Sequence, residues 1–358
     1  MLYRECGQFK VSYRADGQVF PIAQDRIGVG LLVIFAAIFV PMLASEYLLN
    51  AILVPFLIFS LAALGLNFLT GYAGQLSLGS AAFMAVGAYA AYNFQVRIES
   101  MPFLLAFVLG GGVAALVGIA FGLPSLRIKG FYLAVATLAA QFFVLWCLTK
   151  FSWFSNDSPS GVISAPPLEM FGFAFNTPAS KYLLVLGIVV VMFVLGKNLV
   201  RSSTGRAWMA VRDMDVAAEV IGIPLIKTKL IAFAISSFYC GMAGALYAFC
   251  YLGTVEPDGF SLELSFRILF MVIIGGVGSI LGNFFGAAFI LLLPIALDLM
   301  LPFISGLLNL PIAGSTVSHI QLMVFGALII FFLVVEPHGL ARLWQIGKEK
   351  LRLWPFPH

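Results

Sequence analysis

The sequence predicts an all-α membrane protein that crosses the bilayer about ten times. Three observations predict this class. First, the chain has 358 residues, of which 61% are hydrophobic and 10% are charged, whereas a soluble domain carries about 45–50% apolar and about 25% charged residues. Second, the mean hydropathy is +1.04. Third, long apolar runs follow one another closely, and the polar stretches between them leave no room for a soluble domain of ordinary size.

The expected elements follow from the positions of these runs. Residues 1–26 are polar, lack the apolar core of a cleaved signal peptide and are expected to form a cytoplasmic arm. The candidate spans are Ile27–Leu43, Tyr47–Leu69, Gly79–Phe94, Pro102–Leu123, Phe131–Leu148, Tyr182–Gly196, Leu230–Tyr251, Phe266–Leu281, Asn283–Leu301 and Ile320–Val335. Only Gly282-Asn283 divides the eighth span from the ninth. Residues 336–358 are expected to form a cytoplasmic tail.

The basic residues indicate the orientation of this chain. Alternation of ten spans places both termini on one side, and all but four of the 20 lysines and arginines lie on that side. The four exceptions are Arg97, Lys150, Lys181 and Arg267. Because Lys and Arg concentrate in cytoplasmic loops, both termini are predicted to be cytoplasmic. Loop 150–181 is then outside, and loop 197–229, with the most basic cluster, is inside.

The sequence contains no residue set for catalysis, for a metal or for ATP. There is no GxxxxGK[ST] motif, the four cysteines form no CxxC pair, and the three histidines share no helical face. Every Asp, Glu, Lys and Arg falls in a predicted loop or near a span end, and Asp298 is the deepest. A proton-coupled carrier normally needs a buried carboxylate. Energy for transport is therefore expected from elsewhere, for example from a partner subunit.

The segment from Thr70 to Ser80 is the clearest polar interruption of the apolar chain. It holds three glycines, one glutamine and two serines, and no charged residue. We expect a broken or re-entrant segment buried in the bundle, where freed backbone groups could meet a polar solute. The candidate pathway residues are Asn67, Tyr72, Gln75, Ser77 and Ser80. A plain tight turn with a glycine packing contact is the alternative, and the sequence leaves both open.

Small residues recur at helical spacing in several spans. The examples are Gly118 with Gly122, Gly241 with Gly244, and Gly278 with Gly282 and Gly286. Glycine lets helix backbones approach closely and gain dispersion contacts, so these positions predict helix packing.

The inside loop 197–229 predicts a helix outside the membrane. Ser202-Ser203-Thr204 offers an N-cap, residues 205–221 have a helical pattern, and Gly222 with Pro224 ends it. Its apolar stripe consists of Ala207, Met214, Ala217, Ala218 and Ile221, and Arg206, Arg212, Asp213, Asp215 and Glu219 surround it. A helix on lipid headgroups favours larger apolar residues and Trp, of which only Trp208 is present. The stripe therefore favours docking into a groove of another protein.

Several spaced motifs resemble one family. Residues 203–246 read STGRAWMAVRDMDVAAEVIGIPLIKTKLIAFAISSFYCGMAGAL, and the run 70–89 contains GYAGQLSLGSAAFMAVGAY. RIKGFYLAVATL at 127–138, VIIGGVGSILGNFFG at 272–286 and VEPHGL at 335–340 complete the set. Together they resemble the branched-chain amino-acid ABC transporter permeases of the LivM type, from about Asn67 to Leu340. Residues 27–335 would then be the permease domain.

This resemblance implies a function and a set of partners. The family forms one of two non-identical permease subunits in the bacterial inner membrane, where two cytoplasmic ATPase subunits bind ATP and a periplasmic substrate-binding protein delivers the solute. No cofactor is expected in this chain, and no nucleic acid. Membrane lipid surrounds it. The solute would be a branched-chain or other hydrophobic amino acid.

The loop 197–229 also resembles the EAA loop of ABC permeases, which contacts the ATPase. Ala217-Ala218 and Gly222 keep the Ala-Ala-x3-Gly spacing, whereas Val216 stands where that loop often has Glu. The residues implied in ATPase coupling are Gly205, Arg206, Asp213, Ala217, Ala218, Glu219 and Gly222. Ser80 stands where many relatives have His.

Two other functions stay open at this point, and a third is disfavoured. The same architecture could carry urea or short-chain amides, because a binding protein can hold all of the substrate recognition. An ion-coupled carrier or a channel is the alternative from another class. A membrane-embedded enzyme would need a nucleophile, a metal or a carboxylate pair, and the sequence offers none.

Overall fold

The computed structural model describes residues 12, 23–99, 101–125, 131–156, 158, 162–170, 173–308, 323–324, 326–328, 330–332, 334 and 339–353. The α-helices are α2 (Ala23–Leu43), α3 (Val54–Asn67), α4 (Ser80–Arg97), α5 (Phe103–Ser125), α6 (Phe131–Lys150), α7 (Pro178–Arg201), α8 (Ser203–Asp213), α9 (Asp215–Val220), α10 (Leu225–Leu246), α11 (Leu262–Gly275), α12 (Ile280–Leu308) and α14 (Gly339–Leu353). Three π-helical stretches, Leu48–Leu53, Phe68–Tyr72 and Tyr247–Leu252, extend α3 and α10, and Asp258–Phe260 forms a 3₁₀ turn.

The predicted helical membrane class is confirmed. Within the described residues, seven helical stretches are long and apolar enough to cross a membrane: Asp25–Leu43, Leu48–Tyr72, Phe103–Leu123, Tyr132–Lys150, Pro178–Arg201, Leu225–Leu252 and Ile280–Met300. Helices α4 and α11 overlap the predicted third and eighth spans. With 18 and 14 residues, they are shorter than each of these seven stretches. The predicted tenth span, at 320–335, lies largely outside the described residues. The count of ten stays a prediction.

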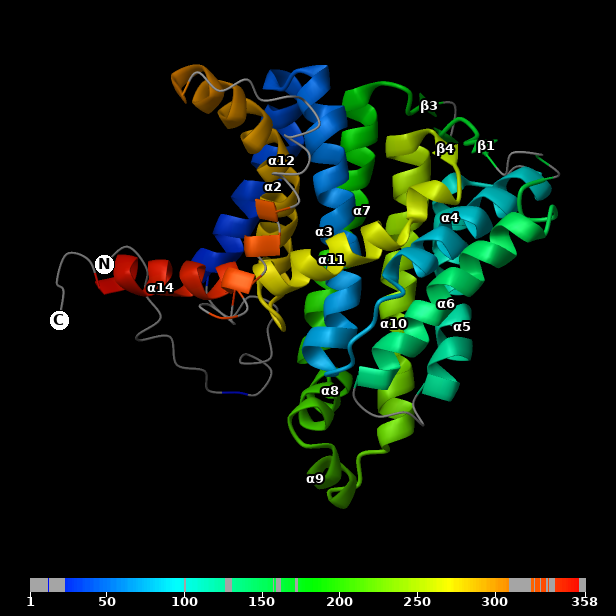
Figure 1. Ribbon diagram of the computed structural model, residues 1–358, viewed down its shortest axis with the longest axis vertical. Coiled ribbons are helices and arrows are strands. Elements are labelled where there is room, and N and C mark those ends of the chain that lie inside the picture. The colour runs from blue at the N-terminus through cyan, green and yellow to red at the C-terminus, as the bar shows by residue number, and fades with distance from the viewer. Residues whose placement is uncertain are drawn as a thin grey trace.

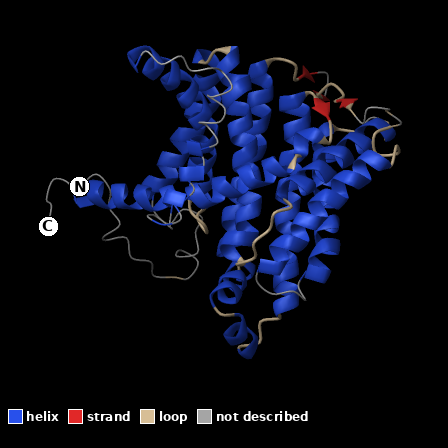
Figure 2. Ribbon diagram, viewed as in Figure 1, coloured by secondary structure: helices blue, strands red, loops and turns tan. Residues whose placement is uncertain are grey.

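The two long loops lie at opposite ends of the bundle. Four two-residue strands, β1 (Ile163–Ser164), β2 (Glu169–Met170), β3 (Phe173–Ala174) and β4 (Thr254–Val255), pair antiparallel as β1 with β4 and β2 with β3. Figure 2 places all of these strands at one end of the helices. Helices α8 and α9 project from the other end (Figure 1). This arrangement agrees with the predicted alternation of the loops.

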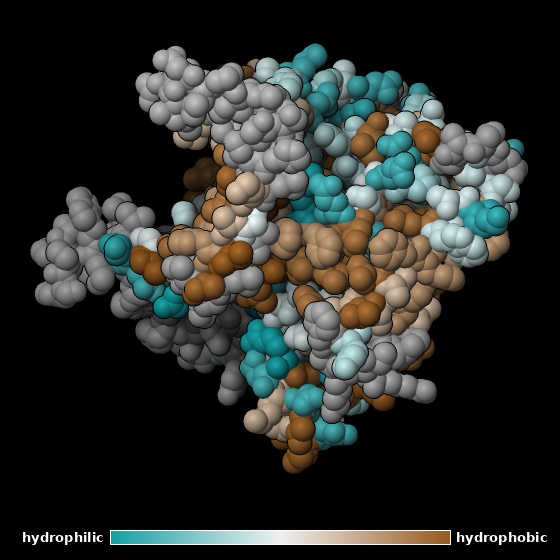
Figure 3. Space-filling view, viewed as in Figure 1, coloured by the Kyte–Doolittle hydropathy of each residue, from teal (hydrophilic) through white to brown (hydrophobic). Residues whose placement is uncertain are grey.

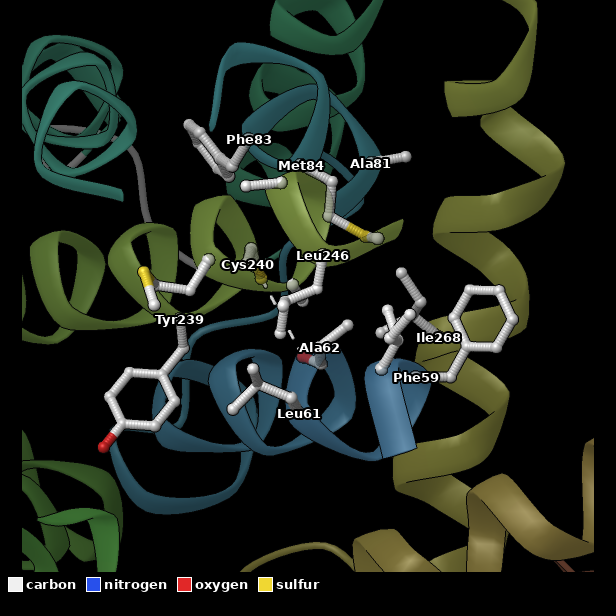
Figure 4. Close-up of a cluster of buried hydrophobic side chains, with 14 of the residues drawn as sticks. Phe59, Leu61, Ala62, Ala81, Phe83, Met84, Tyr239, Cys240, Leu246 and Ile268 are labelled. Carbon is white, nitrogen blue, oxygen red and sulfur yellow. Dashed lines mark hydrogen bonds between the residues drawn. The ribbon is translucent and has the colours of Figure 1, made fainter. Parts of the chain in front are cut away.

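Helices α3, α4, α5 and α10 form the packed centre. The close-up in Figure 4 shows side chains of α3, α4 and α10 meeting, with the Cys240 thiol 3.8 Å from the Ala62 carbonyl oxygen. The backbones touch where glycines face each other: a methyl group at Gly87 would clash with Gly241, and one at Gly244 would clash with the Met84 backbone. The predicted packing role of Gly241 and Gly244 is therefore confirmed.

The outer surface of the bundle is apolar, as a lipid-facing surface must be. Large apolar side chains of α2 are exposed, such as Leu32 and Met42, and none of the spanning part of that helix is buried. Figure 3 shows broad hydrophobic areas over the middle of the molecule and more hydrophilic residues toward its ends.

The predicted division at Gly282-Asn283 is wrong. Helix α11 ends at Gly275, and α12 begins at Ile280, so the break lies at residues 276–279. Gly276 and Gly278 adopt φ values of +118° and +80°, which L side chains rarely allow. Asn283 is helical, and its amide is bonded to Asn67 instead of marking a turn.

The predicted single helix over 205–221 is also wrong. Met214, with φ −159° and ψ 97°, separates α8 from α9. No Gly or Pro marks this position. The predicted cap is only partly correct: Ser202 is the N-cap residue, but its hydroxyl donates to the Leu199 carbonyl at 2.6 Å.

The end of the predicted ninth span also differs from the sequence prediction. Helix α12 runs to Leu308, so Asp298 lies farther from the helix end than expected. Within the predicted tail, α14 packs on the bundle, where the Trp344 ring lies 5.7 Å from the Phe285 ring.

Candidate functional site

The segment between α3 and α4 is irregular and largely buried, as predicted. The chain leaves the helical path after Tyr72 and resumes it at Ser80. Gln75, Ser77 and Ser80 are each at most 4% exposed. We call residues 73–79 the broken segment. Gly74 within it has a φ of +67°, which the absence of a side chain permits.

Neighbouring helices satisfy the backbone amides at the start of α4. The Leu78 amide donates to Thr137 Oγ1 at 2.9 Å, the Ala81 amide donates to Ser265 Oγ at 2.9 Å, and the Ala82 amide donates to Gln141 Oε1 at 2.7 Å. Thr137 and Gln141 belong to α6, and Ser265 belongs to α11. These three acceptors are neutral and buried. Sequence reasoning missed them, although buried Gln and Thr inside apolar spans are the signal that would find them.

Two side chains at this site keep unused hydrogen-bonding capacity. The Oε1 atom of Gln75 and the hydroxyl of Ser80 are buried and have no hydrogen-bond partner among the described residues. The Ser77 hydroxyl accepts a long hydrogen bond from the Gly79 amide, at 3.4 Å. The Tyr72 ring packs on Phe68, with 6.2 Å between the ring centres. The site therefore gathers uncharged polar atoms inside an apolar bundle.

Asn67 ties the end of α3 to the turn between α11 and α12. Its Nδ2 atom donates to the Ser279 carbonyl and to Asn283 Oδ1, both at 3.0 Å. Its Oδ1 atom accepts from the Gly278 amide at 2.9 Å. The side chain is fully buried, so the structure places Asn67 in a protein contact that fixes the turn 276–279.

Helices α8 and α9 form a projecting hairpin, held to the bundle by Trp208. This side chain is fully buried, and its Nε1 atom donates to the Thr228 carbonyl at 3.0 Å. Its ring lies 6.2 Å from the Phe68 ring. Trp208 therefore faces neither lipid nor solvent. Gly205 lies against the backbone of Val200, where a side chain would clash.

The exposed apolar surface of the hairpin consists of larger residues than the predicted alanine stripe. It is formed by Met214, Val216, Val220 and Ile221, each at least 65% exposed, and we call it the tip surface. Ala217 is exposed beside it, whereas Ala218 is 2% exposed and packs inward. The predicted stripe does not lie on one face, because the chain turns at Met214. Figure 3 shows hydrophobic atoms at this projecting end.

The remaining predicted hairpin residues are mostly exposed. Arg206, Asp213 and Glu219 face solvent, and the Nη1 atom of Arg206 donates to the Arg201 carbonyl at 2.9 Å. Gly222, with a φ of +89°, follows α9 and has open space around it.

Arg212 joins the hairpin to the broken segment. Its Nη1 atom donates to the Gly71 carbonyl at 2.9 Å, and its Nη2 atom lies 2.9 Å from Asp213 Oδ1. Its side-chain stem lies beside the exposed Gly74, where an added Cβ would come within 2.9 Å of Arg212 Cγ. An added Cβ on Gly278 would be 3.4 Å from Arg212 Nη1. One hairpin residue therefore bonds to Gly71 and lies close to both irregular segments of the bundle.

No grouping of three His, Cys, Asp or Glu side chains suited to a metal occurs in the described part of the chain. Cys147, Cys240 and Cys250 are free thiols. Cys6, His319, His338 and His358 lie outside the described residues.

Comparisons with known proteins identify relatives of this chain. Residues 48–333 match the family described as branched-chain amino acid transport system / permease component. The high-affinity branched-chain amino acid transport system permease protein LivM of Escherichia coli K12 is 28% identical over 307 residues, covering 79% of this chain and 68% of that protein. A probable LivM of Methanocaldococcus jannaschii is 25% identical over 82% of this chain and 93% of that protein.

More distant transporters also match part of the chain. The autoinducer 2 import system permease protein LsrC of an Enterobacter species is 28% identical over 53% of this chain and 54% of that protein. No solved structure matches. The resemblance inferred from the motifs is thus confirmed, and this multi-pass membrane protein belongs to the family of branched-chain amino acid transport system permease components.

Proposed function

We propose that this chain is a translocation subunit of an ATP-driven importer in the bacterial inner membrane. It takes branched-chain or other hydrophobic amino acids from a periplasmic binding protein and passes them inward. A second, non-identical permease subunit completes the path. Two cytoplasmic ATPase subunits bind the ATP, so this chain supplies no catalytic residue and needs no cofactor. The family and the names of the LivM relatives support this proposal.

The observation that carries the proposal is the contact between Arg212 and Gly71. A bundle without an ATP site of its own needs a part that receives motion from outside and passes it to the solute path. The hairpin α8–α9 has an exposed apolar tip surface at one end and, through Arg212, a direct hydrogen bond to the residues before the broken segment. These two features on one short hairpin support its role as the coupling element.

In this mechanism, the ATPase subunits dock on the tip surface and move the hairpin when they close on ATP. The motion shifts Arg212 and, with it, the broken segment and the turn 276–279. Two arrangements of these segments open the path to either side of the membrane. ATP binding favours one arrangement because the ATPases bind the two with different affinity.

Within the coupling element, individual residues have different proposed roles. Ala217 and Glu219 contact the ATPase from the exposed face, together with Arg206 and Asp213. Gly205 permits close packing of α8 against the end of α7, Ala218 packs inward, and Gly222 sets the turn that follows α9.

The proposed solute path runs past the broken segment. Gln75 and Ser80 offer uncharged hydrogen-bonding atoms without partners among the described residues, which suits brief contact with a polar solute. Ser77 lies in the same segment and Tyr72 directly before it, and Asn67 holds the turn 276–279 in position. Weak, uncharged contacts let a solute leave as easily as it enters.

The proposed topology has ten spans with both termini in the cytoplasm. Residues 1–26 form the N-terminal arm, 27–335 the permease domain and 336–358 the C-terminal tail. Loop 197–229 faces the ATPases, and loop 150–181 faces the binding protein.

Purification and reconstitution test this function. The chain, expressed with its genomic neighbours, is expected to purify with a second permease and two ATPase subunits. In liposomes, the assembly should take up labelled leucine only with ATP and binding protein. Uptake of urea or acetamide in preference to leucine would identify the alternative substrate class. Uptake by the chain without ATPase subunits, driven by an ion gradient, would overturn the proposal in favour of a carrier.

A further inference from the structure

A cavity of about 620 Å³ lies between α4, α5 and α6, away from the broken segment and the hairpin. Its walls are largely apolar and include Val86, Val117, Phe121 and Val144. Helix α6 packs less extensively on the bundle than α4, α5 and α10 pack on one another, which leaves this space. A space of this size is in the range of sites that bind organic molecules.

The polar atoms of the cavity gather at one end. Arg97 is the charged residue of its lining, and Asn93 and Trp153 adjoin it. Arg97 is held in place: Nε donates to Asn93 Oδ1 at 2.9 Å, Nη2 donates to the Trp153 carbonyl at 2.8 Å, and the guanidinium lies 4.3 Å from the centre of the Trp153 ring. Asn93 is itself fixed by hydrogen bonds to the Tyr89 and Phe154 carbonyls.

We propose that this cavity binds one phospholipid of the surrounding membrane, with an acyl chain inside and the phosphate at Arg97. The apolar wall matches the chain, and the fixed guanidinium matches the anionic phosphate. Along α4, the distance from Val86 to Arg97 is about 16 Å at about 1.5 Å per residue, which suits an extended chain. A zwitterionic amino acid fits poorly, because the lining offers its ammonium group no carboxylate within the described residues.

Retained lipid is the first measurement. The full assembly is washed in detergent and supplied with phosphatidylglycerol, and bound lipid is measured by native mass spectrometry. The wild-type protein is expected to retain about one phospholipid more than a variant with a filled cavity, Val117→Phe. Arg97→Gln should weaken retention about tenfold or more, because a charge-assisted hydrogen bond is lost. Lys150→Gln, at an exposed lysine that does not line the cavity, is the matched control and should retain the lipid.

Cys147 gives a second measurement that does not depend on the variants' folding. Its free thiol lines the cavity. Delipidated protein should react faster with N-ethylmaleimide at Cys147, and returned phosphatidylglycerol should slow the reaction. Peptide mass analysis assigns the label, and buried Cys240 and Cys250 serve as internal references.

The outcomes separate this site from the proposed transport function. Equal lipid retention in the wild type, Arg97→Gln and Val117→Phe, with no effect of lipid on Cys147, would overturn the inference even if the ATPases purify with the chain. Protection of Cys147 by leucine in place of lipid would also overturn it, because the cavity would then belong to the solute path. Equal binding of phosphatidylglycerol and phosphatidylethanolamine would support recognition of the shared phosphate.

Discussion

The guanidinium of Arg212 donates a hydrogen bond to the Gly71 carbonyl oxygen, with 2.9 Å between Nη1 and the oxygen. The two residues are 141 positions apart in the chain, and they belong to the projecting hairpin and to the end of a membrane span. Because the Gly74 backbone also lies beside the Arg212 stem, a shift of the hairpin is expected to move the broken segment.

Replacement of Arg212 by Gln should uncouple ATP hydrolysis from transport. A hydrogen bond from a charged donor contributes about 1.5–3 kcal/mol, roughly a ten- to hundredfold change in an equilibrium. We expect leucine uptake per ATP to fall about tenfold while assembly is retained. Lys227→Gln, at an exposed basic residue of α10 with no proposed role in docking, is the control and should keep its ratio of uptake to hydrolysis. An equal loss in both variants would assign the effect to general charge and not to the Gly71 contact.

Substitutions at the adjacent residues Ala217 and Ala218 should distinguish an effect on ATPase docking from an effect on folding. Ala217→Glu places a charge on the exposed face and should lower the amount of ATPase subunit that purifies with the chain, while the melting temperature stays within a few degrees. Ala218→Glu buries an unpaired charge and should reduce the yield of folded protein. The measurements are subunit ratio on a gel and thermal stability in detergent. Unchanged ATPase content in Ala217→Glu would argue against docking at the tip surface.

Substitution by leucine should have different effects on stability and uptake at the two amide side chains of the candidate site, Asn67 and Gln75. Asn67→Leu removes three hydrogen bonds and leaves the part-buried Gly278 amide without this acceptor, so it should lower the thermal stability, by about 1–3 kcal/mol for each unpaired group. Gln75→Leu removes an oxygen that bonds to no described residue and should slow leucine uptake with little loss of stability. Normal uptake in a well-folded Gln75→Leu protein would return the broken segment to a packing role.

Alanine substitutions at Gly222 and Gly74, two glycines with positive φ, compare the cost of backbone strain alone with the cost of strain plus a steric clash. Gly222→Ala should cost about 1–2 kcal/mol for the left-handed backbone alone, because nothing lies near its Cβ position. Gly74→Ala should cost more and also reduce coupling, because its methyl group would press on Arg212. Melting temperature and uptake per ATP distinguish the two effects. A larger loss of coupling in Gly222→Ala would contradict the assigned role of Gly74.

The sequence predicted the features that depend on composition and local pattern. The apolar runs, the irregular segment after Tyr72 and the helix outside the membrane all follow from residue type along the chain. The break at 276–279 could not be placed from the sequence. Asn283 is the polar residue of this apolar run, whereas the positive φ values of Gly276 and Gly278 depend on tertiary packing. Met214 ends a helix without any helix-breaking residue nearby.

Contacts between distant segments could not be predicted from the sequence for a related reason. The helical pattern placed Arg212 among the charged residues around the stripe and left Trp208 as the one large residue suited to lipid headgroups. Helical periodicity does not report which surface of the bundle a hairpin folds against. Gln141 and Ser265 lie 124 residues apart in the chain, and both accept hydrogen bonds from backbone amides at the start of α4. No local sequence pattern predicts a contact between residues so far apart in the chain.

The neutral acceptors at the first turn of α4 have an electrical consequence. The amino end of a helix carries about half a positive charge, and here Thr137, Gln141 and Ser265 bond to it without any carboxylate in that turn. The helix dipole is therefore expected to leave a positive potential inside the bundle near Ser80. Along the proposed solute path, this potential is expected to repel sodium, potassium and hydronium ions, so that the proposed transport would leave the ion gradients of the membrane intact.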